Sequence, residues 1–141
     1  MPSAYFAAPL FTDAERFWNA DLVAALRQAL PEWTWTVPQE FGAAYLGEQG
    51  MDYGAVYADC VAHLERASLV VAVLDGADAD SGTAWEVGYA CARACPVIGW
   101  RSDWRPGEDQ GVNCMLARSC RRLVGDRATL LAAVAEIAEV R

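Results

Sequence analysis

The sequence lacks the residues on which several common catalytic and binding sites depend. It has a single histidine, His63, which lies in a segment with helical spacing and not beside a serine or cysteine that could complete a catalytic triad. It contains neither GxGxxG nor a P-loop sequence, so a dinucleotide or triphosphate cradle is not supported. Five cysteines without paired spacing, Cys91 and Cys95 among them, do not make a metal site with one histidine. Carboxylates remain as the catalytic groups, and we expect no metal and no cofactor.

Positive charge and long hydrophobic runs are also scarce. The 11 basic residues face 19 acidic ones, which gives a formal net charge of −8. This balance disfavours a nucleic-acid partner but allows a small uncharged ligand such as a nucleoside. No apolar run reaches the roughly 20 residues that span a bilayer, so we expect no membrane association. No basic region followed by an apolar segment opens the sequence, which predicts a cytoplasmic protein.

Apolar and aromatic residues, by contrast, are plentiful. The chain has 141 residues, 55% of them apolar, with 6 Trp, 5 Tyr and 4 Phe. A chain of this length forms one ordinary domain, which we place at residues 1–141. The aromatic content is higher than the core of one such domain needs, so we expect a homo-oligomer.

Hydrophobic periodicity predicts alternating strands and helices. We expect strands at 3–8, 33–37, 68–74, 96–100 and 123–124, and helices from 12 or 13 to about 30 and at 52–67, 82–94 and 126–140. Residues 38–51 and 101–112 are expected to be irregular, the former as a loop that covers a site. This order predicts an α/β fold: a single doubly wound, flavodoxin-like domain with a five-stranded parallel sheet flanked by helices, and with strand 33–37 near the sheet edge.

The most informative stretch is residues 80–90, which follows the apolar strand at 68–74. In an open α/β sheet, ligands bind at the carboxyl ends of the strands, so a helix that opens at residues 81–83 would border the ligand crevice. We expect Glu86 in the first turn of that helix, where the helix dipole lowers the pKa of a carboxyl group. Asp75, Asp78 and Asp80 lie close by in sequence. Paired carboxylates suit glycosyl transfer.

Each of these residues also has a purely structural interpretation. Glu86 can be a partner of the helix dipole, and Asp80 can be a helix cap. Asp75 can simply turn the chain, and Tyr5 can be a core residue with a satisfied hydroxyl group. Position alone does not decide between the two interpretations.

Four segments together resemble the nucleoside 2-deoxyribosyltransferase family. They are residues 5–11 (Tyr-Phe-Ala-Ala-Pro-Leu-Phe), Asp59, residues 80–90, and the stretch from Arg101 to Leu116. The segments follow one another in the family's order and extend over nearly the whole chain. Residues 80–90 (Asp-Ser-Gly-Thr-Ala-Trp-Glu-Val-Gly-Tyr-Ala) are the most specific of the four.

The resemblance implies catalytic roles for Glu86, Tyr5 and Asp80. Glu86 is similar to the nucleophile that takes the 2-deoxyribosyl group from a nucleoside and later passes it to another base. Tyr5 is similar to the tyrosine whose hydroxyl orients that carboxylate. Asp80 matches the aspartate that contacts and protonates the base, although Asp75 or Asp78 could exchange roles with it.

The resemblance also implies contacts to substrate. Asp59 matches an aspartate that holds the sugar hydroxyls, and Gln39 lies where the family often has a residue that contacts the base. Asn113 resembles an asparagine that reaches into a neighbouring subunit to bind the 5′-hydroxyl, with Met115 nearby. The residues expected to bind substrate are Asp59, Asp75, Gln39, Gly82, Asn113 and Met115.

The function implied is exchange of the base of 2′-deoxyribonucleosides through a covalent 2-deoxyribosyl–glutamate intermediate. The expected partners are deoxyribonucleosides, free purine and pyrimidine bases, and other copies of the chain, from a dimer to a hexamer. One alternative is an N-glycosidase that hydrolyses deoxynucleosides or their 5′-monophosphates, although the apolar residues 7–11 disfavour a phosphate. Another is a noncatalytic nucleoside-binding domain.

Overall fold

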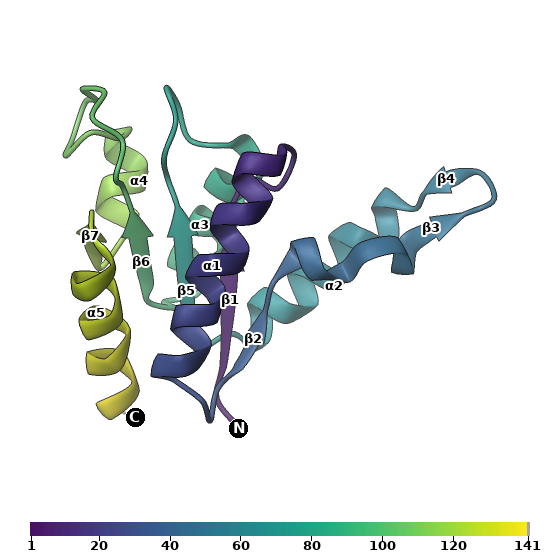
Figure 1. Cartoon of the computed structure of the whole chain (residues 1–141), viewed down its shortest axis with the longest axis horizontal. Helices are drawn as coiled ribbons and strands as arrows, with labels where there is room; N and C mark the ends of the chain where they lie inside the picture. The colour runs from purple at the N-terminus through teal and green to yellow at the C-terminus, as the bar shows by residue number, and fades with distance from the viewer. Residues whose placement is uncertain (141) are drawn as a thin grey trace.

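The computed structural model describes residues 1–140 and contains a five-stranded parallel sheet (Figure 1). Its strands, in spatial order, are β2 (Thr34–Thr36), β1 (Ser3–Ala7), β5 (Leu69–Val73), β6 (Val97–Trp100) and β7 (Arg122–Val124). This is the order of flavodoxin-like proteins once the hairpin strands are left aside. The predicted fold class is confirmed, and β2 is an edge strand as expected.

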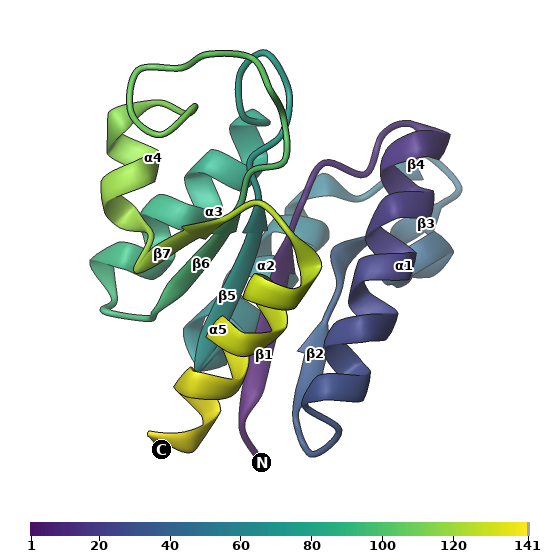
Figure 2. The ribbon, with the colours of Figure 1, turned by 60° about the vertical axis from the view of Figure 1, so that its left-hand side comes forward.

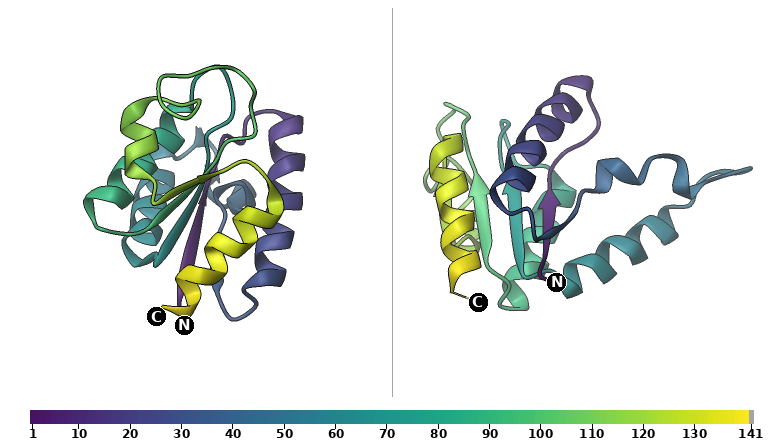
Figure 3. Two further views of the ribbon diagram at one scale, coloured as in Figure 1. Left: turned by 90° about the vertical axis from the view of Figure 1, so that its left-hand side faces the viewer. Right: turned by 60° about the horizontal axis from the view of Figure 1, so that its bottom comes forward.

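Helices cover both faces of the sheet, as Figures 2 and 3 show. One core cluster joins α1 (Asp13–Ala29) and α5 (Arg127–Glu139) to the strands. The other core cluster lies beneath α2 (Tyr53–Arg66), α3 (Ser81–Ala92) and α4 (Cys114–Ser119). Since both faces are covered, β5 is apolar and buried along its whole length, which explains its continuous apolar sequence.

The alternation of side chains along β1 determines which layer each one enters. Ala4 and Phe6 pack with α1 and α5, whereas Tyr5 and Ala7 belong to the cluster beneath α2 and α3. Successive side chains of a strand point to opposite faces of a sheet. The register of β1 therefore directs Tyr5 towards the layer that contains α3.

The region expected to be a loop, residues 38–51, is more ordered than the sequence predicts. It forms the short 3₁₀ helix η1 (Pro38–Tyr45) and a hairpin of β3 (Leu46–Gly47) and β4 (Gly50–Met51), which projects from the body together with the start of α2 (Figure 1). Pro38 is suited to the first turn of a helix because it needs no backbone donor there. Gly42 has a φ of 57° and kinks η1, a conformation that side chains with a Cβ rarely adopt.

The helix α4 is absent from the sequence-based prediction. It is only six residues long and begins at the N-cap Asn113, whose side-chain oxygen accepts the N–H of Met115. Such a short helix has too few residues to show apolar periodicity. Within residues 1–140, none of the helices has the length and apolarity needed to cross a bilayer.

Candidate active site

A cavity of about 390 Å³ lies beside the carboxyl ends of β1 and β5. Its wall combines the β1–α1 loop, η1, β4, α2 and the first two turns of α3. The lining residues are Ala8, Leu10, Phe11, Pro38, Gln39, Phe41, Gly42, Tyr45, Met51, Tyr53, Val56, Cys60, Asp80, Gly82, Thr83 and Glu86. The wall is mostly apolar, and its two carboxylates lie on one side. This arrangement suits a flat organic ligand whose reacting end meets the carboxylates.

A larger hollow of about 740 Å³ lies on the projecting hairpin, between Ala44 and Ala55. It is open to solvent, and its lining contains neither Glu86 nor Asp80. We therefore place the candidate site in the smaller cavity. Across the described residues 1–140, His, Cys, Asp and Glu side chains do not gather in groups of three or more that could hold a metal ion.

Tyr5 and Glu86 form the central contact of the site. The buried Tyr5 hydroxyl donates a hydrogen bond of 2.6 Å to Oε1 of Glu86. Burial and the neighbouring Glu86 charge raise the pKa of Tyr5 far above its usual range, so its hydroxyl remains a donor. Burial also raises the pKa of Glu86 to about 7, the Asp80 charge adds to this effect, and the bond from Tyr5 opposes it. Strand β1 and helix α3 thus together position one carboxylate at the cavity wall.

The position of Glu86 within α3 differs from the expectation. The helix begins at Ser81, so Glu86 lies in its second turn and not in its first. The influence of the helix dipole falls off beyond the first turn, and burial of the carboxyl group dominates instead. The expected lowering of the Glu86 pKa is therefore wrong in sign.

Asp80 lines the cavity and also caps α3. Its Oδ2 accepts the Thr83 N–H at 2.9 Å and the Thr83 hydroxyl at 3.1 Å. Gly82 is packed against this carboxylate, because a Cβ at Gly82 would lie 3.3 Å from the same oxygen. The structural interpretation of Asp80 as a cap is confirmed, and the cap lies where its charge acts on Glu86.

Asp59 lies next to the cavity, behind Tyr45. Its Oδ2 accepts the Tyr45 hydroxyl, and its Oδ1 lies 3.4 Å from Nδ1 of His63. Tyr45 and Cys60 line the cavity. Neither residue is singled out by the sequence patterns, and Tyr45 falls in the region expected to be a loop. The helical spacing of Val56 and Cys60 indicates that these two side chains lie on the same face of α2, the face that lines the cavity.

Gln39 lines the cavity, but its amide is engaged at both ends by α1. Its Oε1 accepts the Asn19 side-chain amide at 2.8 Å, and its Nε2 donates to the Arg16 carbonyl at 3.1 Å. Both bonds fasten η1 to α1. The geometry thus gives Gln39 a part in holding the cavity wall.

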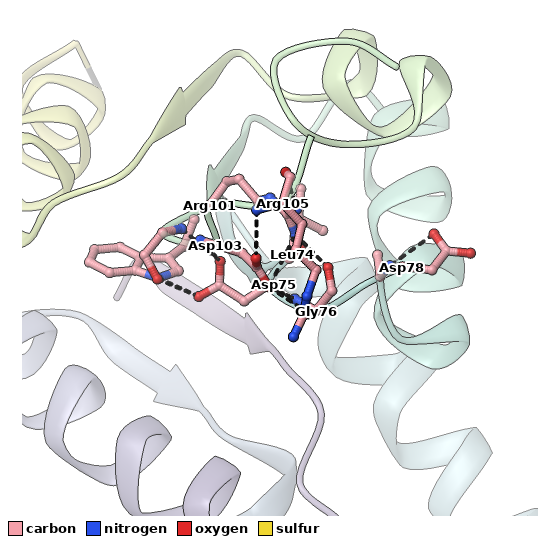
Figure 4. Close-up of polar contacts among 10 residues, drawn as sticks. Leu74, Asp75, Gly76, Asp78, Arg101, Asp103 and Arg105 are labelled. Carbon is pink, nitrogen blue, oxygen red and sulfur yellow. Dashed lines mark hydrogen bonds and ion pairs between the residues drawn. The ribbon is translucent and has the colours of Figure 1, made fainter. Parts of the chain in front are cut away.

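Asp75 lies in a polar network beyond the cavity lining (Figure 4). Its Oδ1 accepts the backbone N–H groups of Ser102 and Asp103, and its Oδ2 accepts the Ser102 hydroxyl and the Trp100 indole N–H. Arg101 donates to the carbonyls of Leu74 and Gly76 at 2.9 and 2.8 Å. The network ties the loop after β5 to the segment after β6.

Asp78 stands apart from that network in Figure 4, and its Oδ1 accepts a local hydrogen bond from the N–H of Ala79. Of the three aspartates, Asp80 is the one that lines the cavity beside Glu86. The geometry thus favours Asp80 over Asp75 and Asp78 for contact with a ligand there.

Replacing Asp75 with asparagine is expected to destabilise the fold by about 1–3 kcal/mol, because an amide nitrogen cannot accept the Trp100 N–H. Thermal unfolding should show a lower midpoint. An unchanged midpoint would show that these hydrogen bonds of Asp75 do not stabilise the two loops that they join.

Asn113 and Met115 lie outside this cavity. Asn113 is exposed and caps α4, and the Met115 side chain is 72% exposed. Neither lines the cavity of its own subunit. A role in catalysis would therefore need a neighbouring subunit.

The sequence and the fold of this chain are similar to those of known proteins. A family model described as "Nucleoside 2-deoxyribosyltransferase" matches residues 4–116. A conserved protein from Enterococcus faecalis V583 is 27% identical, with a TM-score of 0.83 over 100% of this chain and 99% of that chain. No curated protein sequence matches this chain.

Two solved deoxyribosyltransferases share the fold. The 2-deoxyribosyltransferase from Bacillus psychrosaccharolyticus is 24% identical, with a TM-score of 0.75 over 92% of this chain and 90% of that chain. The enzyme from Leishmania mexicana is 18% identical, with a TM-score of 0.74 over 96% and 98% respectively. At these identities the likeness concerns the arrangement of helices and strands.

Proposed function

Because this chain belongs to the nucleoside 2-deoxyribosyltransferase family, we propose that it exchanges the base of 2′-deoxyribonucleosides through a covalent intermediate on Glu86. The observation that carries this proposal is the 2.6 Å hydrogen bond from buried Tyr5 to Glu86 at the wall of the cavity. A carboxylate held in one orientation by a fixed donor is suited to nucleophilic attack. Its pKa of about 7 leaves a large ionised fraction near neutral pH.

In the proposed reaction, an ionised Glu86 oxygen attacks C1′ of the sugar while the bond between C1′ and the base nitrogen breaks. The bonding electron pair leaves with the base, which takes up a proton at the site. A second base then attacks C1′ from the same cavity, and the ester bond to Glu86 breaks with its electron pair on the regenerated carboxylate. The N–H proton of the attacking base returns to the group that protonated the first base. The transition states resemble an oxocarbenium ion, which the negative charge of Glu86 stabilises.

The other residues have supporting roles in this proposal. Tyr5 orients the nucleophile, and Asp80 contacts the base and passes it a proton. Asp59 binds the sugar hydroxyls, and its hydrogen bond with the Tyr45 hydroxyl breaks when it does so. The apolar wall contributed by Phe41 and neighbouring residues packs against the faces of the base.

We further propose that the chain works as a homo-oligomer, with Asn113 completing the site of a neighbouring subunit. An exposed aromatic strip on α2 and α3 supports self-association. The Tyr57 and Trp85 rings lie 5.8 Å apart, and the Trp85 and Tyr89 rings are stacked at 5.0 Å. Tyr57 is 60% exposed and Trp85 45%, so a partner would bury a large apolar area.

The function is tested by incubating the protein with deoxyinosine, with and without free adenine, and following the products by chromatography. The proposal predicts deoxyadenosine formation, with little hypoxanthine released when adenine is absent. Release of hypoxanthine at one rate in both samples would identify a hydrolase. Binding of deoxyinosine without any turnover would identify a noncatalytic nucleoside-binding domain.

A further inference from the structure

The N-terminus of α1 borders the candidate site, and the backbone N–H groups of the two residues that precede this helix are bound by Glu15. Leu10 and Phe11, just before this helix, line the cavity. Oε2 of Glu15 accepts the backbone N–H groups of Phe11 and Thr12, both at 2.8 Å. Thr12 in turn accepts the N–H of Glu15 at 3.1 Å, which completes a capping box. A helix N-terminus with free N–H groups is a common phosphate site, and here a carboxylate of the chain already binds the N–H of the N-cap residue and of the residue before it.

The charge of Glu15 is only partly offset by its neighbours. Its hydrogen bonds to backbone N–H groups lower its pKa, so Glu15 is ionised at neutral pH. Arg16, the nearby cation, is paired with Asp13 and also donates to the Leu10 carbonyl. The group of Asp13, Glu15 and Arg16 therefore carries one net negative charge at the rim of the cavity.

The other helices that border the cavity are capped in the same way. Asp80 accepts the Thr83 N–H at the start of α3, and Asp52 accepts the Ala55 N–H at the start of α2. The charged side chains in the described lining are the carboxylates of Asp80 and Glu86, with no arginine, lysine or histidine among them. A phosphate that entered would meet negative charge on several sides.

We propose that Glu15 is a specificity-determining residue that excludes ligands with a 5′-phosphate and restricts the site to nucleosides with an uncharged 5′ end. Its carboxylate occupies the N–H groups of Phe11 and Thr12, which are then not open to a phosphate, and its charge repels the phosphate dianion. The inference rests on the proposed function for the identity of the substrate. It adds the physical means by which this chain distinguishes a nucleoside from a nucleotide.

The test compares deoxyadenosine with its 5′-monophosphate in the wild-type protein and in Glu15→Gln. Glutamine also serves in a capping box, so this variant removes the charge and keeps the cap. We expect kcat/KM for the monophosphate, relative to the nucleoside, to rise about tenfold in Glu15→Gln at low salt. The kcat/KM for the nucleoside should stay within about twofold of the wild-type value. Added salt should reduce the difference in the monophosphate-to-nucleoside ratio between the wild type and the variant.

Glu32→Gln is the matched control, because it removes one exposed carboxylate beyond the opposite end of α1. It should leave the ratio of kcat/KM for the two substrates unchanged. This result would distinguish an effect of the local charge at Glu15 from an effect of the net charge of the protein. An unchanged ratio in Glu15→Gln, with the unfolding midpoint of the wild type, would overturn the proposal. So would a wild-type protein that uses both substrates equally.

Equilibrium binding distinguishes failure of this inference from failure of the proposed function. Titration calorimetry measures the Kd of deoxyadenosine and of deoxyadenosine 5′-monophosphate without any turnover. If exchange is absent but Glu15→Gln lowers the Kd of the monophosphate about tenfold, the proposed reaction fails and the role of Glu15 is supported. If exchange occurs and neither Kd nor kcat/KM responds to the substitution, the role of Glu15 fails alone.

Discussion

Replacement of Glu86 with glutamine is expected to abolish base exchange and to make the folded protein more stable at pH 8. Glutamine cannot form the ester with C1′, so the rate should fall by about 10⁴-fold or more. Its side-chain oxygen can still accept the Tyr5 hydroxyl, so the local geometry is retained. The loss is measured by chromatography of the exchange reaction, and the stability by denaturant unfolding.

The gain in stability follows from the raised pKa of Glu86. The folded protein holds the Glu86 proton up to a pKa of about 7, whereas an unfolded glutamate loses it near its usual value of 4.5. Between these values the folded state binds more protons than the unfolded state, so stability falls as the pH rises. The substitution should therefore stabilise the fold by about 1–3 kcal/mol at pH 8 and by almost nothing at pH 4.

Glu65→Gln is the matched control for this variant. Glu65 on α2 also accepts a tyrosine hydroxyl, that of Tyr89 at 3.0 Å, but it is exposed. Its substitution should change neither the exchange rate nor the pH dependence of unfolding. Base exchange by Glu86→Gln at a rate near that of the wild type would exclude Glu86 as the nucleophile.

Sequence patterns predicted the sheet and the long helices because these elements have strong periodic signals. The strand β5 is a continuous apolar run, and α1 has a capping residue, apolar positions at helical spacing and Pro31 after its end. The helix α4 and the hairpin that follows η1 are short and depend on tertiary contacts. Residues 38–51 contain enough glycine and proline to resemble an irregular loop.

The candidate site was predicted only in part, because its geometry depends on the loops. The sequence indicated that Glu86 and Asp80 belong to one helix start, but it could not place Glu86 in the second turn. The direction of the Glu86 pKa shift depends on the burial of its carboxyl group, which follows from tertiary packing and cannot be deduced from the sequence around residue 86. Asp75 and Asp80 could be distinguished only once the network with Ser102 was visible.

Replacement of Tyr5 with phenylalanine is expected to move the pH–rate profile of base exchange to higher pH. The reaction needs ionised Glu86, so kcat/KM should rise with pH through the Glu86 pKa of about 7. The Tyr5 hydroxyl stabilises the ionised form, and its removal raises that pKa further. A hydrogen bond to a charged group corresponds to about 1–2 pKa units, so kcat/KM at pH 6.5 should fall at least about tenfold and recover partly at pH 9.

Tyr89→Phe provides the comparison for this shift, because it removes a hydroxyl from the exposed pair with Glu65 and should leave the profile unchanged. A shift of the acidic limb of the pH–rate profile distinguishes a positioning role of Tyr5 from a merely structural one. Partial unfolding would instead lower the rate at every pH without moving the midpoint. A Tyr5→Phe protein with a reduced rate and an unmoved midpoint would show that the hydroxyl does not control ionisation of Glu86. Movement of the midpoint to lower pH would contradict the direction of the bond, because a donor to the carboxylate can only favour its charged form.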